Sequence, residues 1–99
     1  MTKVSCSDFV SIITGGASGI GRSLALEIVA QTPSEQRGNT HIVIADMRLD
    51  PASEVAEQIK TLGAESTSIE CDIADEQQVV EMAADVQRTF GKVNFLYNV

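Results

Sequence analysis

The chain has 99 residues, 43% of them hydrophobic and 21% charged, with a formal net charge of −7. This length allows at most one domain, and the negative charge argues against a nucleic-acid surface, which requires clustered lysines and arginines. No apolar run reaches the roughly 20 residues of a membrane-spanning helix, and residues 1–8 lack the apolar core of a signal peptide. We therefore expect a cytoplasmic protein without a nucleic-acid or membrane partner.

The first predicted element is a buried strand over residues 9–14, whose sequence FVSIIT is apolar, rich in β-branched residues, and stops at a glycine. From Gly19 the apolar residues recur at helical spacing, so the glycine-rich segment is a turn from a strand into a helix. The helix is expected to end near Thr32. Residues 32–39 (TPSEQRGN) are polar, contain proline and glycine, and predict a surface loop.

The same alternation continues along the chain. Residues 41–46 (HIVIAD) predict a second buried strand that ends in an acid. Pro51 suits the first turn of a second helix, which Gly63 ends. A third strand is predicted over residues 65–73, with alternating faces formed by Thr67, Ile69, Cys71 and Ile73 and by Ser68, Glu70 and Asp72.

A third helix and a fourth strand complete the chain. Asp75 and Gln78 resemble a capping box, and the helix that follows has an apolar stripe before Gly91 ends it. The stripe is predicted to consist of Val79, Ala83, Val86 and Phe90. Residues 93–99 (VNFLYNV) predict the start of the fourth strand.

The element order βαβαβαβ predicts an α/β fold with a Rossmann-like, doubly wound parallel sheet. Residues 1–99 would form the first half of this sheet, as one incomplete domain truncated after the fourth strand. The fourth strand should lie beside the first, which leaves an unpaired apolar edge around Phe95 and Leu96. We expect such an edge to promote self-association or incomplete folding of the isolated chain.

The glycines of the first turn have a physical explanation. The first N–H groups of a helix have no partners inside the helix and attract anions, provided that no side chain blocks the approach. Gly15 permits the tight exit from the strand, Gly19 lets a phosphate approach the backbone, and Gly21 lets the helix pack closely on the strand. The alternative is a glycine-rich turn without a ligand.

The spacing of these glycines identifies a resemblance. The pattern G-x-G-x-x-G is absent, and the sequence reads Thr14-Gly15-x-x-x-Gly19-x-Gly21. This resembles the T-G-x-x-x-G-x-G turn of the short-chain dehydrogenase/reductase family. Three further features resemble the family: an acid at the end of the second strand, an aspartate after the third, and the first asparagine of an N-N-A-G motif after the fourth. They are supplied by Asp46, Asp72 and Asn98, whereas Val99 departs from the second asparagine of the motif.

The resemblance implies an NAD-dependent oxidoreductase of which this chain carries only the cofactor-binding part. It implies that Gly15, Ser18, Gly19, Ile20 and Gly21 line the pyrophosphate and the adjacent ribose. Asp46 would bind the adenosine ribose, Asp72 and Ile73 the adenine, and Asn98 would lie near the nicotinamide ribose. The whole protein would act on a small alcohol or carbonyl substrate, and we expect it to be a homo-oligomer.

No catalytic residue is assigned within the chain. The serine and the Tyr-x-x-x-Lys motif of the family belong to a later part of its members, and Tyr97, the only tyrosine, has no lysine four residues later. We therefore expect residues 1–99 alone to be inert toward alcohols. Asp46 also lies 25 residues beyond Gly21 where about 20 is usual, which we interpret as a surface insertion in the preceding loop.

The preference for NAD is predicted from Asp46. Its carboxylate can accept hydrogen bonds from both ribose hydroxyls and would repel the 2′-phosphate of NADP. Ser18 occupies a position where NADP-using relatives often carry a basic residue, and Arg48 is expected to point away from the ribose.

Several residues have other interpretations. Residues 16–23 (GASGIGRS) fit a P-loop except that Arg22 replaces the lysine, so a nucleoside triphosphatase is a weaker alternative. A non-catalytic nucleotide-binding or interaction protein on the same half-fold is another. We interpret His41 as structural. The cysteines, Cys6 and Cys71, lack metal-ligand spacing, so we expect reduced thiols and no metal site.

Overall fold

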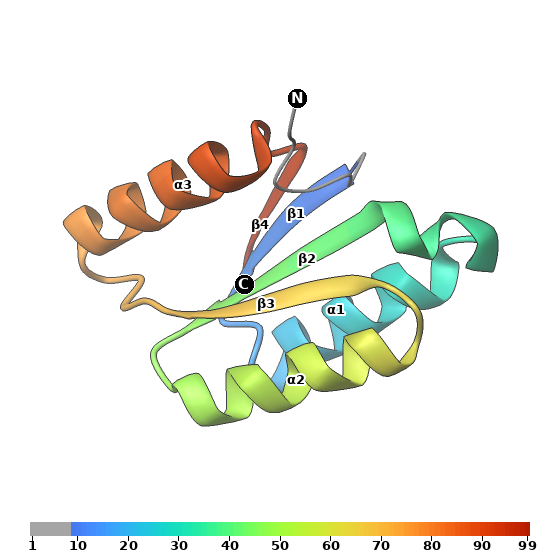
Figure 1. Cartoon of the computed structure of the whole chain (residues 1–99). Coiled ribbons are helices and arrows are strands. Elements are labelled where there is room, and N and C mark those ends of the chain that lie inside the picture. Colours follow the sequence, from blue (N-terminus) through green and yellow to red (C-terminus); the bar gives the residue numbers. More distant parts are fainter. Residues whose placement is uncertain (1–8) are drawn as a thin grey trace.

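The structure is a computed structural model that describes residues 9–99. Residues 1–8, which include Cys6 and which we expect to contain no signal peptide, lie outside the described residues. Strands and helices alternate along the chain, with one added 3₁₀ helix, η1 (Figure 1). The elements are β1 (Phe9–Thr14), α1 (Gly19–Gln31), η1 (Ser34–Asn39), β2 (Thr40–Asp46), α2 (Leu49–Thr61), β3 (Glu65–Glu70), α3 (Glu76–Phe90) and β4 (Phe95–Asn98).

The four strands form one parallel sheet in the order β3-β2-β1-β4. β1 is therefore central, and its register sets Ile13 beside Ile44 of β2 on one side and beside Tyr97 of β4 on the other. Helices α1 and α2 cover one face of the sheet and α3 covers the opposite face (Figure 1). This arrangement confirms the predicted fold class and the position of the fourth strand beside the first.

The core has two parts, one on each face of the sheet. Ile13, Ile42 and Ile44 point toward α1 and α2, where they pack on Ala25, Val29, Val55 and Ile59. The alternate strand residues Val10, Ile12 and Val43 point toward α3 and pack on Met82 and Val86. A strand that is buried on both faces has an almost continuous apolar sequence, which explains why FVSIIT and HIVIAD read as short hydrophobic runs.

The third strand departs from the sequence prediction in two ways. β3 ends at Glu70, so residues 71–73 lie beyond it. The chain leaves the sheet there because the Asp72 N–H binds Gln78 Oε1 at 2.8 Å and the Asp72 carboxylate accepts from the Ala74 N–H at 2.9 Å. In addition, Thr67 of the predicted apolar face is exposed, whereas Ser66 is buried.

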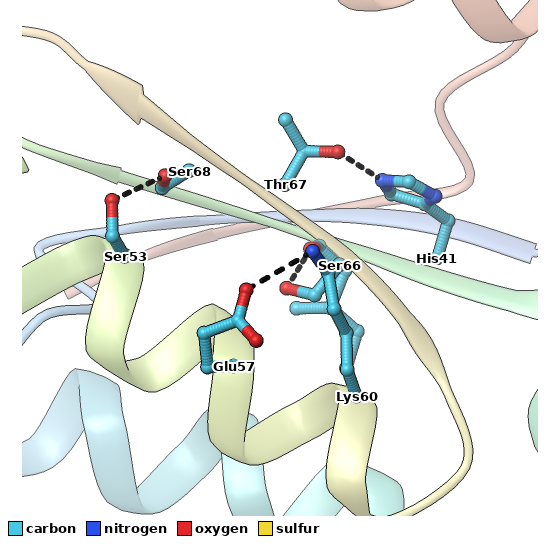
Figure 2. A network of polar contacts seen from close by, with 8 residues as sticks. His41, Ser53, Glu57, Lys60, Ser66, Thr67 and Ser68 are labelled. Carbon is cyan, nitrogen blue, oxygen red and sulfur yellow. Dashed lines mark hydrogen bonds and ion pairs between the residues drawn. The ribbon is translucent and has the colours of Figure 1, made fainter.

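Hydrogen bonds explain how polar residues fit into β3. Ser66 Oγ donates to the Ile42 carbonyl at 2.7 Å, and Ser68 Oγ lies 2.9 Å from Ser53 Oγ of α2 (Figure 2). On the opposite face, Thr67 Oγ1 lies 2.7 Å from His41 Nε2 (Figure 2). A hydroxyl in the sheet costs little when it is paired, so β3 tolerates serine beside Ile42 and Ile44 of β2.

The helix termini follow the predicted signals, with small shifts. α2 begins at Leu49, which places Pro51 within its first turn, where a missing N–H costs no helical bond. Asp75 caps α3 by accepting from two amides of the first turn, and Gly91 ends α3 with a φ of 80°. In the α3 stripe Val86 is buried as predicted, whereas Met82 is buried in place of Ala83, which is exposed.

The segment between α1 and β2 lies at the surface as predicted, but it is mostly a 3₁₀ helix where we predicted a loop. Residues 34–39 form η1, and Arg37 fastens this segment to the rest of the fold. The Arg37 guanidinium donates to the carbonyls of Thr32 and Leu62, each at 3.0 Å, and to the Ala30 carbonyl at 3.5 Å. These carbonyls belong to the carboxyl ends of α1 and α2, where a cation is favoured. Within residues 9–99 no helix is long and apolar enough to cross a membrane.

Candidate functional site

The turn between β1 and α1 brings the helix unusually close to the strand. Gly15 has a φ of 67°, and its N–H donates to the Ala45 carbonyl of β2 at 2.8 Å. A Cβ atom on Gly21 would lie 2.1 Å from the Gly15 carbonyl oxygen and 2.9 Å from Gly16 Cα. The start of α1 can contact the turn in this way only if residue 21 has no side chain.

The amino end of α1 is open toward solvent. Ser18 is the N-cap residue, yet its side chain caps no N–H group, and the first turn contains no acidic residue. Gly19 has a φ of 59°, and a Cβ atom there would meet nothing within 4 Å. Ile20 is 77% exposed. An uncapped helix start beside empty space is suited to bind an anion through its N–H groups.

Asp46 ends β2 and joins this strand to the glycine turn. Its Oδ2 accepts from the Ala17 N–H at 3.2 Å, and its Oδ1 accepts from the Arg48 N–H at 3.0 Å. The side chain is only 11% exposed. The structure thus places Asp46 beside the glycine turn.

The guanidinium of Arg48 lies beside Asp46 and Ser18, while its direction relative to the ribose stays a prediction. The Arg48 guanidinium folds back, with Nε 3.8 Å from Asp46 Oδ1 and Nη2 donating to Ser18 Oγ at 2.9 Å. Asp46 accepts from the Arg48 N–H and is the acidic partner of its guanidinium, whereas Ser18 belongs to the turn before α1. Arg48 therefore connects the end of β2 to the glycine turn.

Asp72 and Ile73 lie at the same end of the sheet. The Cys71 N–H donates to the Asp46 carbonyl at 2.9 Å, which places the start of this segment beside Asp46. Asp72 is partly exposed and Ile73 is 48% exposed. Burial raises the pKa of the Cys71 thiol, and the carboxylates of Asp72 and Asp75 raise it further, so the environment of this free, buried cysteine favours the protonated thiol.

Asn98 lies at the end of β4, across from the glycine turn. The buried Thr14 hydroxyl is 3.1 Å from Asn98 Oδ1 and 3.2 Å from the Tyr97 carbonyl oxygen, and it accepts from the Val99 N–H at 3.4 Å. Thr14 thereby fastens β4 to β1 at their carboxyl ends. No contact joins Asn98 directly to Asp46 among the hydrogen bonds described for residues 9–99.

The contacts that three residues make in this site were not predicted from the sequence, although Thr14 belongs to the recognised motif. Thr14 links two strands, Ala17 supplies an N–H to Asp46, and Arg48 binds Ser18. A threonine at the end of an otherwise apolar strand was an available signal for Thr14, because a buried hydroxyl requires a partner. The Ala17 contact is made by the backbone, so its side chain gives no signal.

The P-loop alternative finds no support in the geometry of the turn. The side chain of Arg22, which replaces the required lysine, donates to Gln58 Oε1 of α2 at 3.0 Å. The cation is therefore directed toward α2. Within the described residues, no group of three or more His, Cys, Asp or Glu side chains is placed to hold a metal ion.

Comparisons with known proteins match this arrangement. A family model described as short chain dehydrogenase matches residues 10–99. A mitochondrial (-)-isopiperitenol/(-)-carveol dehydrogenase of Mentha piperita is 41% identical over 88 residues, which are 89% of this chain and 30% of the relative. The chain thus spans about a third of the length of the curated relatives that it matches.

Solved structures give the same result. A hydroxysteroid dehydrogenase from Escherichia coli superposes with a TM-score of 0.76 at 28% identity, over 96% of this chain and 37% of that one. A short chain dehydrogenase/reductase from Burkholderia phymatum in complex with NAD has a TM-score of 0.74 at 26% identity, over 97% of this chain and 31% of that one. The resemblance suggested by Thr14-Gly15-x-x-x-Gly19-x-Gly21 is confirmed, and the chain belongs to the short-chain dehydrogenase family.

Proposed function

We propose that this chain forms the NAD-binding part of an oxidoreductase that transfers a hydride between the nicotinamide and an alcohol or carbonyl substrate. The supporting observation is the constellation at the carboxyl end of the sheet, where an open helix start, Asp46 and Asn98 follow three neighbouring strands. Ligands of open α/β sheets bind outside the carboxyl ends of the strands. NAD in the solved relative from Burkholderia phymatum is consistent with the proposal.

The pyrophosphate would lie at the start of α1. Its charge is attracted by the N–H groups of the first turn, and Gly19 leaves the space through which it can approach. Asp72 and Ile73 would face the adenine, and Asn98 the nicotinamide ribose. The nicotinamide accepts or releases the hydride, and this chain's residues bind and orient the cofactor. We further propose that the whole protein takes a small alcohol or carbonyl compound as substrate and forms a homo-oligomer.

Asp46 is the basis for proposing NAD in preference to NADP. A 2′-phosphate about 4 Å from this carboxylate would be repelled by roughly 4 kcal/mol at an effective dielectric constant near 20. Arg48 offsets part of that repulsion because its Nε lies 3.8 Å from the Asp46 carboxylate. We therefore expect a preference for NAD of about tenfold, well below the full electrostatic value.

The test is a calorimetric titration of the wild type and of Asp46→Ala with both cofactors. The variant should lose about 1 to 3 kcal/mol of NAD binding, which is the value of hydrogen bonds to a charged group, and should bind NADP more tightly than the wild type does. Glu54→Ala is the matched control, because it removes the same charge from an exposed position of α2. Tighter binding of NADP than of NAD by the wild type would overturn the assignment of Asp46.

A further inference from the structure

Ser18 does not do what a serine at the start of a helix normally does. A serine N-cap usually accepts a hydrogen bond from the second or third N–H group of its helix. In α1 these groups belong to Ile20 and Gly21, and the Ser18 side chain accepts from neither of them. The helix thereby forgoes a stabilising contact at the position where an anion is expected to bind.

The Ser18 hydroxyl is instead held by Arg48. Arg48 Nη2 donates to Ser18 Oγ at 2.9 Å. The arginine is fixed at its other end, because its N–H donates to Asp46 Oδ1 at 3.0 Å and its Nε lies 3.8 Å from the same oxygen. Asp46 is in turn fixed to the glycine turn through the Ala17 N–H at 3.2 Å. These contacts form a closed chain from β2 to the start of α1.

These contacts determine whether the Ser18 hydroxyl or an anion can bind the N–H groups at the start of α1. Without the hydrogen bond from Arg48, the Ser18 hydroxyl could rotate and accept a hydrogen bond from the Ile20 or Gly21 N–H. Ser18 already has the extended backbone of an N-cap residue, with a φ of −158° and a ψ of 168°. The same N–H groups would then be occupied by the protein's own side chain. A phosphate would have to displace that bond before it could bind.

We propose that Arg48 is a positioning residue that holds the Ser18 hydroxyl away from the start of α1 and so keeps the anion site open. The proposal rests on the proposed function, in which the pyrophosphate of NAD binds at that helix start. It differs from a direct contact between Arg48 and the cofactor, because the effect of Arg48 is transmitted through the Ser18 hydroxyl. Removal of that hydroxyl should therefore abolish the effect.

The first experiment measures hydrogen exchange of the Ile20 and Gly21 amides by NMR in the absence of any cofactor. Arg48→Ala should slow the exchange of one of these amides about fivefold, as expected for a new N-cap bond of average strength. Arg48→Lys keeps a donor for Ser18 and should exchange as the wild type does, and so should the double variant Ser18→Ala/Arg48→Ala. Equal exchange in all four proteins would refute the positioning role without affecting the proposed function.

The second experiment is a double-mutant cycle of NAD binding, measured by calorimetry. Arg48→Ala should weaken NAD binding about fivefold more when it is introduced into the wild type than when it is introduced into the Ser18→Ala variant. Arg22→Ala removes an equal charge near the same turn and should show no such coupling. An equal loss in both backgrounds would mean that Arg48 acts directly on the cofactor, which overturns the proposal. Absence of NAD binding by the wild type would instead contradict the proposed function.

Discussion

Gly21→Ala should destabilise the chain severely. The added methyl carbon would lie 2.1 Å from the Gly15 carbonyl oxygen, 2.8 Å from the Gly15 carbonyl carbon and 2.9 Å from Gly16 Cα. All three are backbone atoms, and Gly15 is held in place by its bond to Ala45, so no flexible side chain can move aside. The start of α1 must shift by about 1 Å, which costs about 3 kcal/mol or more as an overpacked contact.

Helix propensity acts in the opposite direction but is too weak to compensate. Alanine favours a helix over glycine by about 1 kcal/mol, so a net loss of at least about 2 kcal/mol remains. In urea denaturation followed by circular dichroism, the midpoint should fall by about 1 to 2 M. A loss of about 2 kcal/mol is a large part of the roughly 5 to 15 kcal/mol by which a typical domain is stable.

Gly38→Ala is the matched control. A Cβ atom at Gly38 would meet nothing within 4 Å, and its backbone does not require a glycine. This variant should unfold within about 0.5 kcal/mol of the wild type or be slightly more stable. If Gly21→Ala and Gly38→Ala had the same midpoint, the close packing of α1 on the turn would be refuted as the reason for a glycine at position 21.

Three other predictions concern stability and association. Asp75→Ala should lower the free energy of unfolding measured in urea by about 1 kcal/mol, since two amides of α3 lose their acceptor. Glu76→Ala changes the neighbouring exposed residue, and an equal loss of stability in that variant would contradict the role of Asp75 as a cap. Burial is the main cause that lowers the pKa of His41, so the folded chain binds fewer protons than the unfolded one, and the free energy of unfolding should fall as the pH drops below about 6.5. His41→Gln should flatten this dependence of stability on pH, and an unchanged dependence would exclude His41 as its origin. Leu96→Lys, at the unpaired edge of β4, should reduce the self-association of the chain measured by sedimentation velocity. Val80 is an exposed residue of α3, and an equal reduction by Val80→Lys would show that the unpaired edge of β4 is not responsible.

The sequence was sufficient to predict the succession of the four strands and of α1, α2 and α3, because each of them has a distinct local signal, while the place of β4 beside β1 followed from the topology of doubly wound sheets. Short apolar runs mark β1 and β2, Gly91 marks the end of α3, and the Asp75 cap marks its start. These signals depend on backbone preferences within a few residues. The place where β3 ends was missed, because the Asp72 N–H is taken by Gln78 six residues later, and alternation of polar and apolar residues carries no information about that bond.

The site was predictable in part, for a similar reason. The glycines were recognised from their spacing, and the close contact of Gly21 with the turn provides a physical cause for that spacing. The direction of Arg48 could not be predicted, since its partner Ser18 lies 30 residues earlier in the chain and belongs to another element. Contacts between side chains from separate elements depend on the assembled fold, whereas local patterns reflect only the element itself.

The eight residues between α1 and β2 add length to the chain without adding a loose loop. Arg37 ties this segment to the carboxyl ends of two helices, at the end of the sheet opposite the glycine turn. A flexible insertion would lower stability through the entropy of closing a longer loop, but this segment is ordered by the bonds of Arg37 to Leu62 and Ala30 outside it and to Thr32 within it, which reduces that cost. The fold therefore accommodates these eight residues at the far end of the sheet from the glycine turn, where they leave the contact of Asp46 with that turn unchanged.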